Sequence, residues 1–248
     1  MANSAPSANF EKLYSDKQTA DGLPALTPWD IGEAQPAVKH LVACGAVNGE
    51  VLDPGTGPGH NAIYYASQGY SATGIDVSPS AIERAQLNAE RAGVTVDFQV
   101  ADATKLDGLE GRFDTVVDSA FYHVFGDSED IQSAYAHALH RATRPGARLF
   151  MFEFGMHNVN GLPGMGLTAE NFQRVLPSAG WRIDYLGTTT YKSHMSAKDL
   201  AAMGANAGNA GFAERLRPVH ERLAVIEPML ENHVVHMPAW AVVATRID

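Results

Sequence analysis

The sequence predicts an α/β protein whose mostly parallel, seven-stranded sheet is covered by helices on both faces. Apolar strand segments alternate with helical segments along most of the 248 residues, as in repeated strand–helix units. The strand segments are almost continuously apolar, which is typical of parallel strands buried on both faces. Acidic residues follow four of these strands, and ligands of such sheets bind at the carboxyl ends of the strands. We therefore expect a single domain, 1–248, with a ligand site at that edge of the sheet.

The composition narrows the class of protein and of partner. The chain is 45% hydrophobic and 19% charged, with a formal net charge of −10, which fits a globular domain with a real core. Lysine and arginine are scattered, so no basic patch indicates a nucleic-acid partner. No apolar run reaches the ~20 residues of a membrane span, and the first ten residues lack the apolar centre of a signal peptide. We expect a cytoplasmic monomer or homodimer with no nucleic-acid or membrane partner.

The sequence does not predict a disulfide, a metal site or a nucleophilic serine. Cys44 is the single cysteine, so no internal disulfide and no thiolate metal site can form, and we expect its side chain to be buried. His233 and His236 form a loose pair without an assignable third ligand, so no metal is predicted. Ser119 lacks the G-x-S-x-G turn of a hydrolase nucleophile.

The segments up to residue 154 supply five strands and most of the helices. A short helix is expected around Phe10–Tyr14, and a longer one from Pro36 to Cys44. Ser78 and Pro79 mark the N-terminus of a helix that Gly93 ends. The expected strands are 50–53, 72–76, 95–100, 113–118 and 147–154, and the expected helices between them are 61–67, 79–92 and 130–143.

The remainder of the chain adds a glycine-rich loop, a helix and two strands. These are expected at 155–166, 169–179, 181–190 and 239–245, in that order. Residues 191–237 lie between the last two strands and are expected to form a lid-like helical insertion.

The insertion is expected to contain two helices. The first covers 196–203 and gives way to a loose stretch rich in glycine, alanine and asparagine at 204–211. Apolar residues then recur at spacings of three and four from Phe212 to Leu230, which indicates an amphipathic helix that Pro218 should kink or restart. Its apolar face is expected either to pack on the core or to form a lid or dimer surface.

The most specific segment is the loop that follows the first strand. Three glycines, Gly55, Gly57 and Gly59, stand between a strand ending in Asp53 and the start of a helix. Glycine lets a ligand approach the backbone, and a helix start presents N–H groups to it. A dinucleotide-binding loop would place its third glycine at position 60, where this chain has His60. The loop therefore predicts a nucleotide-like ligand but disfavours a dehydrogenase.

Four segments together resemble the class I S-adenosylmethionine (SAM)-dependent methyltransferases. Asp53-x-Gly55-x-Gly57-x-Gly59 matches the first motif of that family, and Gly74-Ile75-Asp76-Val77-Ser78 matches the second. Asp102-Ala103 matches the position that contacts adenine, and Arg144–Leu149 resembles the turn before the fifth strand. The resemblance implies a Rossmann-like methyltransferase fold, SAM as cofactor and S-adenosylhomocysteine as its product.

The resemblance also implies which residues bind the cofactor. Asp76 would accept hydrogen bonds from both ribose hydroxyls, since a carboxylate has two acceptor oxygens. The side chain of Asp102 would accept from the exocyclic amine of adenine, with the Ala103 backbone beside the ring. The full implied set is Trp29, Gly32, Asp53, Gly55, Thr56, Gly57, Gly59, Asp76, Val77, Asp102, Ala103, Asp118 and Ser119.

Two further segments resemble a bacterial subgroup of that family. Pro28-Trp29-Asp30-Ile31-Gly32-x-x-Gln35-Pro36 and Asp118–Phe125 are similar to segments of thiopurine-methyltransferase-like enzymes and of mycobacterial heterocyclic toxin methyltransferases, which methylate hydroxyquinolones. By this resemblance 1–35 is an N-terminal cover segment, and Trp29 and Gly32 close over the cofactor. A core anchor is the alternative role for Trp29. The segment 191–237 is longer than the hairpin of many relatives, so the resemblance leaves the acceptor open.

Methyl transfer requires an acceptor atom in line with the methyl group in a site without water. His123 is the preferred general base because it follows the fourth strand and imidazole titrates near neutral pH. Asp118 is the second catalytic candidate, and Tyr122, Glu153 and His157 are weaker ones. A thiol or acidic N-hydroxyl that arrives ionised would need no base. The expected acceptor-binding residues suit a flat apolar ring and are Phe121, Tyr122, His123, Met156 and Met165.

The function predicted from the sequence is methyl transfer from SAM to an O, N or S atom of a small apolar heterocycle or phenol, for example a hydroxyquinolone. One alternative is a quinone-pathway carbon methyltransferase, which shares the cofactor motifs. Another is a non-catalytic SAM-binding sensor. Nucleic-acid amino-methyltransferases are disfavoured because the segment Asp118–Phe121 lacks their proline pair.

Overall fold

The structure is a computed structural model that describes residues 10–11, 14–15, 28–206 and 210–248. Most of the N-terminal cover segment expected at 1–35 lies outside the described residues. Of the short helix expected around Phe10–Tyr14, residues 10, 11 and 14 are described and are helical, and 12–13 lie outside the described residues. No helix in the described ranges is long and apolar enough to cross a membrane.

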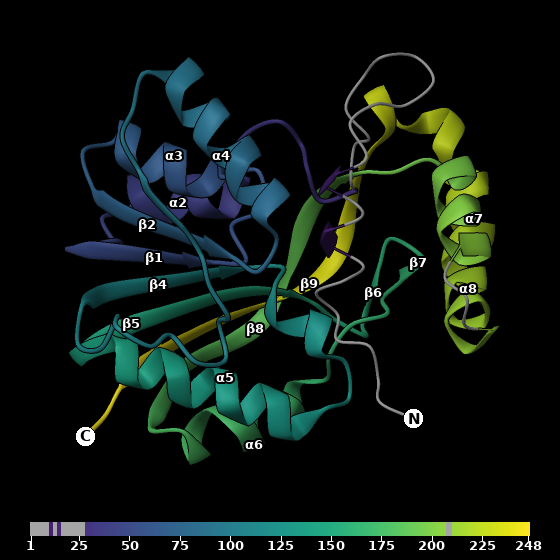
Figure 1. The fold of residues 1–248 in the computed structure, drawn as a ribbon. Helices are drawn as coiled ribbons and strands as arrows, with labels where there is room; N and C mark the ends of the chain where they lie inside the picture. Colours follow the sequence, from purple (N-terminus) through teal and green to yellow (C-terminus); the bar gives the residue numbers. More distant parts are fainter. Residues whose placement is uncertain (1–9, 12–13, 16–27, 207–209) are drawn as a thin grey trace.

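A seven-stranded sheet forms the centre of the molecule (Figure 1). Its strand order is β3-β2-β1-β4-β5-β9-β8, with β9 antiparallel to both of its neighbours and the other pairs parallel. The mostly parallel sheet predicted from the sequence is thus confirmed. The strands are β1 (Glu50–Pro54), β2 (Ser71–Asp76), β3 (Asp97–Val100), β4 (Phe113–Ser119), β5 (Thr143–Phe154), β8 (Trp181–His194) and β9 (Val234–Arg246).

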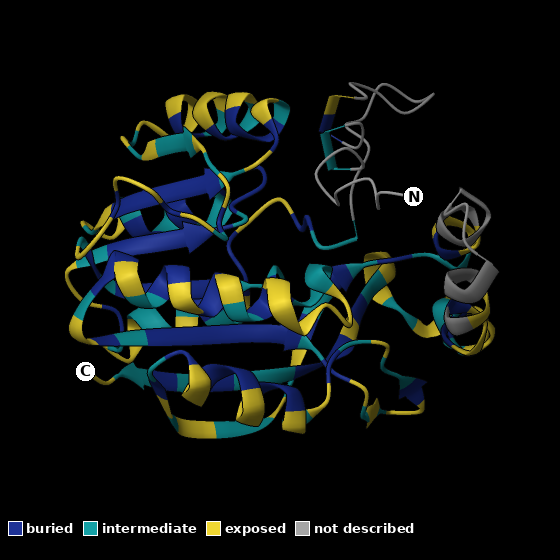
Figure 2. Cartoon of the chain, turned by 60° about the horizontal axis from the view of Figure 1, so that its bottom comes forward, coloured by how far each residue is buried: buried dark blue, intermediate teal, exposed yellow. Residues whose placement is uncertain are grey.

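Helices cover both faces of the sheet, as the alternating pattern predicts (Figure 1). One face carries α2 (Pro36–Ala43), α3 (His60–Ser67) and α4 (Pro79–Ala92), and the other carries α5 (Glu129–Ala142) and α6 (Ala169–Ser178). The local signals for α4 are confirmed: the Ser78 hydroxyl accepts from the Ala81 N–H at 3.1 Å, and Gly93 ends the helix at φ 67°. These helices turn buried side chains to the sheet and exposed ones to solvent (Figure 2).

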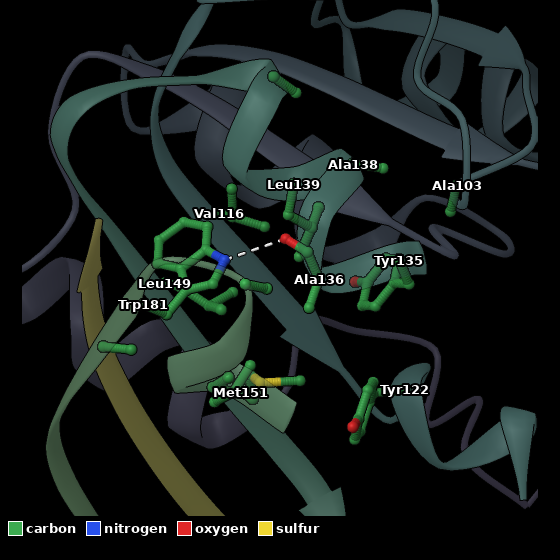
Figure 3. Packing of buried hydrophobic residues seen from close by; sticks show 14 of the residues in the cluster. Ala103, Val116, Tyr122, Tyr135, Ala136, Ala138, Leu139, Leu149, Met151 and Trp181 are labelled. Carbon is green, nitrogen blue, oxygen red and sulfur yellow. Dashed lines mark hydrogen bonds between the residues drawn. The ribbon is translucent and has the colours of Figure 1, made fainter. Parts of the chain in front are cut away.

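The larger hydrophobic cluster lies between the sheet and the α5–α6 layer (Figure 3). Trp181, at the start of β8, is fully buried there, and its indole N–H donates to the Ala136 carbonyl of α5 at 3.0 Å. Burial of an aromatic side chain of this size contributes on the order of 2–3 kcal/mol, and the hydrogen bond satisfies its one polar group. Tyr122 and Tyr135 belong to the same cluster, directly beneath the carboxyl end of β4.

The strands β8 and β9 are longer than predicted and carry the insertion beyond the sheet. Their pairing continues from Trp181 opposite Arg246 to His194 opposite Val234. The helical insertion is therefore 195–233 rather than 191–237, because cross-strand pairing outweighs the polar character of the strand ends. Its helices, α7 (Ala197–Asn206) and α8 (Ala210–Ile226), stand away from the two helix layers (Figure 1).

The insertion and a small hairpin share a hydrophobic cluster of their own. The loop expected at 155–166 contains the two-residue strands β6 (Asn158–Val159) and β7 (Leu162–Pro163). Leu162 is buried against α8 residues such as Leu216 and Leu223. Short 3₁₀ turns, Glu227–Met229 and Glu231–His233, complete the insertion.

Two smaller expectations are wrong, and a third is narrowed. The loose stretch expected at 204–211 is partly helical, since α7 reaches Asn206 and α8 begins at Ala210. Of the kink or restart expected at Pro218, the restart does not occur, since α8 runs through this residue. Cys44 is exposed rather than buried, because it caps the end of α2 on the solvent side, where its sulfur lies 3.4 Å from Nε2 of His40.

Candidate functional site

A cavity opens at the carboxyl ends of β1, β2 and β4, and its volume is about 860 Å³ including the mouth. The sheet order places β1 between β2 and β4, so the chain leaves the sheet in opposite directions on either side of β1. Such a switch point is the usual ligand site of open α/β sheets. The lining residues are Phe10, Tyr14, Trp29, Asp30, Glu33, Gln35, Gly55, Thr56, Gly57, Pro58, His60, Asn61, Asp76, Val77, Ser119, Ala120, Phe121, His123, Val124 and Tyr191.

The glycine loop forms the floor of this cavity, and its glycines are required by geometry. Gly55 and Gly57 have φ angles of 66° and 52°, in the left-handed region that favours glycine. A Cβ atom on Gly55 would lie 2.2 Å from the Phe121 ring, and one on Gly57 would lie 2.8 Å from the Tyr14 hydroxyl. Gly59 is the N-cap of α3 at φ 80°. The loop therefore brings bare backbone to the cavity next to a helix N-terminus.

Two acidic residues hold this loop in place. Asp53 is 2% exposed and accepts a hydrogen bond from the Thr56 hydroxyl at 2.6 Å. Burial raises the pKa of Asp53 to about 7. Asp76 accepts from the Gly57 N–H at 3.1 Å and from the Ser78 N–H at 2.9 Å while facing the cavity. Burial also raises the pKa of Asp76, against the effect of these hydrogen bonds.

The described N-terminal residues form a wall over the loop. The Trp29 indole N–H donates to the Tyr14 hydroxyl at 3.5 Å, and both side chains line the cavity. Asp30 Oδ1 accepts from the Gly32 N–H at 3.0 Å and lies 3.0 Å from Nε2 of His60. Burial favours a higher pKa for Asp30, but the hydrogen bonds from His60 and Gly32 outweigh it and lower that pKa.

Glu11 fixes this wall to α4. Its carboxylate accepts from the Ser78 hydroxyl at 2.5 Å and from the Ser80 hydroxyl at 2.6 Å. A carboxylate at a helix N-terminus also interacts favourably with the helix dipole. The cover over the cavity is thus tied to the helix that follows Asp76.

The end of β4 supplies the opposite wall. Ser119, Ala120 and Phe121 line the cavity together with Tyr191 from β8. The Tyr191 and Ser119 hydroxyls lie 3.0 Å apart. Ala120 has φ 62°, a strained value for a non-glycine residue, and its N–H donates to the Phe152 carbonyl at 2.9 Å. Such strain occurs where the surrounding structure dictates the backbone, often at functional sites.

Beneath this wall lies a pair of fully buried carboxyl groups. Asp118 on β4 and Glu153 on β5 are both 0% exposed. Their oxygens accept from the backbone N–H groups of Phe121 and Tyr122 at 3.1–3.3 Å. The Tyr135 hydroxyl donates to Asp118 Oδ2 at 2.7 Å. Burial raises the pKa of both carboxyls, and the Glu153 charge raises that of Asp118 further.

His123 connects these carboxyls to the cavity. Its Nδ1 lies 2.8 Å from Glu153 Oε2, and its backbone N–H donates to the same oxygen at 3.0 Å. The side chain is 23% exposed and lines the cavity, and its ring packs against Phe154. Burial lowers the pKa of His123 to about 4, because the imidazolium form loses hydration. The imidazole is therefore neutral at physiological pH and able to accept a proton.

The structure brings together most of the residues that the sequence singled out. Nine of them line the cavity: Trp29, Gly55, Thr56, Gly57, Asp76, Val77, Ser119, Phe121 and His123. Gly32, Asp53, Gly59 and Asp118 support these residues from behind through the contacts described above. The sequence reasoning missed Tyr191, whose place in the cavity depends on the unexpected length of β8, and Asn61, which carries no motif signal.

Five other expected site residues neither line the cavity nor support its lining through a described contact. Tyr122 is fully buried against Tyr135 and Phe172, because its side chain turns into the core below the wall. Ala103 is also buried in that core. Met156 and Met165 are 60% and 36% exposed on the loops around the β6–β7 hairpin.

Asp102 is the fifth of these residues, and its carboxylate is occupied locally. It accepts from the N–H and the hydroxyl of Thr104 at 3.0 and 2.7 Å, and it pairs with the Lys105 ammonium at 3.0 Å. Together these contacts lower the pKa of Asp102, although burial opposes them. In the described ranges no group of three histidine, cysteine or acidic residues has the arrangement of a metal site.

Comparisons with known proteins agree with this geometry. Residues 51–146 match the family described as a methyltransferase domain. The chain is 37% identical over 146 residues to the 2-heptyl-1-hydroxyquinolin-4(1H)-one methyltransferase of Mycobacteroides abscessus, covering 58% of this chain and 63% of that protein. It is 30% identical over 176 residues to thiocyanate methyltransferase 1 of Brassica oleracea, covering 70% of this chain and 73% of the relative.

The fold is also similar to solved structures. One of them was described for the conversion of a disulfide bond into a thioacetal group during echinomycin biosynthesis. It aligns with a TM-score of 0.73 at 27% identity and covers 98% of this chain and 92% of its own.

Proposed function

The chain belongs to the class I SAM-dependent methyltransferases, and we propose that it transfers a methyl group from SAM to an oxygen, nitrogen or sulfur atom of a small, apolar heterocyclic or phenolic acceptor. The observation that carries this proposal is a single cavity that joins a glycine-lined floor, Gly55–Gly59, to the neutral imidazole of His123. The first part suits the cofactor and the second suits the acceptor.

The floor and wall of the cavity fit SAM. A Cβ on Gly55 would collide with the Phe121 ring and one on Gly57 with the Tyr14 hydroxyl, so the glycines let these two lining side chains lie against the loop that would hold the cofactor. Asp76 would accept from the ribose hydroxyls, the backbone of 55–59 would contact the cofactor, and Trp29 with the Gly32 turn would cover it. When bound, SAM supplies an electrophilic methyl group.

Of the contacts proposed for SAM, those to adenine would require the largest rearrangement of the site. Asp102 would have to leave Thr104 and Lys105 to accept from the exocyclic amine of adenine. The exposed side chain of Val77 lines the cavity next to Asp76 and offers an apolar surface to the base.

The acceptor end of the cavity favours a flat apolar ring. Phe121, Tyr191 and Val124 line it around His123, and aromatic walls with few polar groups are typical of sites for apolar heterocycles. The names of two relatives give the range of acceptors to consider, a hydroxyquinolone for one and thiocyanate for the other. The imidazole of His123 favours the first kind, because an anionic sulfur nucleophile has no proton to lose.

The residues of this site would act by orientation, exclusion of water and proton removal. The aromatic cover and the buried wall limit access of water, and holding the two reactants in line can contribute ~7–11 kcal/mol to lowering the barrier. His123 would accept the proton of the acceptor as its oxygen or nitrogen gains the methyl group. The cytoplasmic location and the monomeric or dimeric state stay predictions.

The experiment that tests this proposal is an acceptor screen. Hydroxyquinolones, phenols, quinols and thiols are incubated with the protein and isotope-labelled SAM, and products are identified by mass spectrometry. We expect methylated heterocycles or phenols. Labelling on a ring carbon of a quinol would favour the quinone-pathway alternative, and no labelled product from any class would favour the sensor alternative.

A binding measurement supports the screen. Thermal unfolding is recorded with SAM, with S-adenosylhomocysteine and with NAD, since a ligand that binds only the folded state raises the unfolding temperature. SAM and S-adenosylhomocysteine should raise it and NAD should not. Stabilisation by NAD alone would contradict the cofactor assignment.

A further inference from the structure

We propose that Glu153 is a positioning residue for the methyl transfer: it accepts the Nδ1–H of His123, leaves Nε2 free toward the cavity, and balances the charge that His123 gains. The site is then built for acceptors that arrive with their proton, such as a phenol or an N-hydroxyl of a flat ring. This inference rests on the proposed function and deepens it.

Hydrogen-bond geometry determines the direction of the His123–Glu153 contact. Glu153 Oε1 accepts from the backbone N–H groups of Phe121 and Tyr122 at 3.1 and 3.2 Å. Its Oε2 accepts from the His123 backbone N–H at 3.0 Å. Burial raises the pKa of Glu153, but three N–H donors, two of them shared with Asp118 Oδ1, favour its charged form. We therefore assign Nδ1 as the donor to an ionised Glu153 across the 2.8 Å contact.

The second nitrogen of His123 is consequently the acceptor. A neutral imidazole carries one N–H, so an Nδ1–H leaves a lone pair on Nε2. No residue in the described part of the chain hydrogen bonds to Nε2, and the His123 side chain lines the cavity. The orientation is further restrained by the Phe154 ring, whose centroid lies 4.7 Å from that of the imidazole.

Asp118 completes the arrangement by keeping a proton. It hydrogen bonds to Glu153, and two adjacent carboxyls without solvent cannot both ionise easily. The His123 backbone N–H donates to Glu153 alone, and the hydrogen bond between the two carboxyls raises the pKa of Asp118 while it opposes the rise in that of Glu153, so the charge belongs on Glu153 and the proton on Asp118. The buried pair therefore carries one negative charge, directed at His123.

Methyl transfer and proton transfer accompany each other in the proposed reaction. The acceptor oxygen attacks the methyl carbon of SAM, the new O–C bond forms, and the S–C bond breaks with its electron pair left on sulfur. The proton of the acceptor hydroxyl moves to Nε2 of His123. The positive charge thus passes from the sulfonium to an imidazolium beside Glu153.

A weak base is sufficient for this step. Burial lowers the pKa of His123 to about 4, but a hydroxyl oxygen that has gained a methyl group is a far stronger acid than imidazolium. His123 therefore stays neutral before the reaction and takes the proton only as the new bond forms. An acceptor that is already ionised gains nothing from this arrangement.

The test compares a protonated and an ionised acceptor in Glu153→Gln and in a control variant. Glu153→Gln keeps the size of the side chain but removes its charge. It also places an amide N–H where the carboxylate accepts from backbone N–H groups. We expect its kcat to fall about a hundredfold with a phenol or hydroxyquinolone below the acceptor's own pKa, within the usual range for loss of base catalysis. With a thiolate or with the ionised phenol the loss should shrink to a few-fold. Glu90→Gln, at an exposed position of α4, is the matched control.

Double substitution separates positioning from packing. If Glu153 acts through His123, the variant with both His123→Ala and Glu153→Gln should be no slower than His123→Ala alone, since coupled residues are not additive. Equal losses on both acceptors, or losses that multiply in the double variant, would overturn the inference. Absence of product from the wild-type protein would instead refute the proposed function.

A measurement on the unaltered protein covers the case in which Glu153→Gln does not fold. Nitrogen-15 NMR of histidine-labelled protein, with the His123 signals identified by their loss in His123→Asn, reports which ring nitrogen carries the proton. The Nδ1–H tautomer is expected. An Nε2–H tautomer would overturn the inference whether or not an acceptor has been found.

Discussion

His123 has a polar contact on one side and an apolar contact on another, and the two have different effects. Glu153 Oε2, 2.8 Å from Nδ1, orients the ring and fixes its tautomer. The Phe154 ring and the surrounding burial disfavour the imidazolium, which lowers the pKa of His123 to about 4. One residue is thereby both held in place and kept unprotonated.

The first prediction concerns this side chain. His123→Ala should lower kcat about a hundredfold or more with a protonated acceptor, the usual contribution of a general base. The affinity for SAM should change less than threefold, because in the described part of the chain the hydrogen bonds of the His123 ring go to Glu153 and not to the glycine loop. Steady-state kinetics and calorimetric titration with S-adenosylhomocysteine measure the two effects.

The control for this variant is His137→Ala, which removes an exposed histidine of α5. It should leave both quantities at wild-type values. Equal losses of turnover and of cofactor affinity in His123→Ala would remove His123 from the role of base.

At the residue scale, the sequence predicts those site residues whose identity is required by backbone geometry or by a fixed place at a strand end. Gly55, Gly57 and Asp76 are of this kind. The importance of Glu153 was only a weak expectation, since its partners Asp118 and His123 reach it through the pairing of β4 with β5. Tyr191 was missed because its position depends on the register of β8.

Among the elements, the loop between β1 and α3 is the one with the least freedom to change. It is held by Asp53 from below and by Asp76 from the side, and its glycines lie in contact with Phe121 and Tyr14. The proposed cofactor site and the proposed acceptor wall therefore touch at Gly55.

The second prediction tests this contact. Gly55→Ala should weaken binding of S-adenosylhomocysteine at least tenfold, because its Cβ would lie 2.2 Å from the Phe121 ring and must displace it. The left-handed φ should cost a further ~1–2 kcal/mol of unfolding free energy. Calorimetric titration and urea denaturation provide the two measurements.

Gly69→Ala is the matched control for this substitution. Gly69 also has a positive φ, 88°, but a Cβ there would meet nothing within 4 Å. It should show the loss of stability without the loss of binding. Similar binding by both variants would show that the close approach at Gly55 does not matter for the cofactor.

The ends of an element were predicted closely where its own capping residues define them. They were not predicted where they depend on pairing with a strand far away in the sequence. The ends of α4 follow from its own capping residues, Ser78 and Gly93. By contrast, β8 extends four residues beyond Thr190 to His194, and the added residues pair with the start of β9. Lys192 and His236 face each other in that pairing, and no local pattern marks such residues as strand.

For the whole molecule, the site is a source of instability. Asp53, Asp118 and Glu153 are all buried beneath the cavity, and burial raises the pKa of each. A buried carboxyl whose pKa is raised costs folding free energy when it ionises at neutral pH. The fold must offset this cost with its hydrophobic clusters, two packed against the sheet and one shared by the insertion and the β6–β7 hairpin.

The third prediction follows from Asp53, whose pKa is raised to about 7 in the folded protein and is near ~3.9 in an unfolded chain. Between these values the folded state binds more protons, so the unfolding free energy decreases as the pH rises. The Asp53→Asn variant has an amide in place of this carboxyl, and the amide does not ionise in this pH range. The stability of the wild type relative to this variant should fall, by up to ~1.4 kcal/mol per pH unit, between about pH 4 and 7.

Urea denaturation of both proteins from pH 4 to 8 checks this prediction, and the other buried acids cancel because both proteins contain them. Asp107→Asn, at an exposed position, supplies the matched control. Parallel stability curves for the wild type and Asp53→Asn would contradict the raised pKa.

The hydrophobic cluster shared by the insertion and the β6–β7 hairpin has a consequence for how this protein can diverge. Its buried members, such as Leu162, Leu216 and Leu223, belong to neither cluster of the sheet. Substitutions in this cluster should therefore destabilise the insertion and leave the packing around the glycine loop unchanged. Evolution or a designer can therefore vary the region outside the sheet as a separate module, while the methyl-donor machinery is inherited intact.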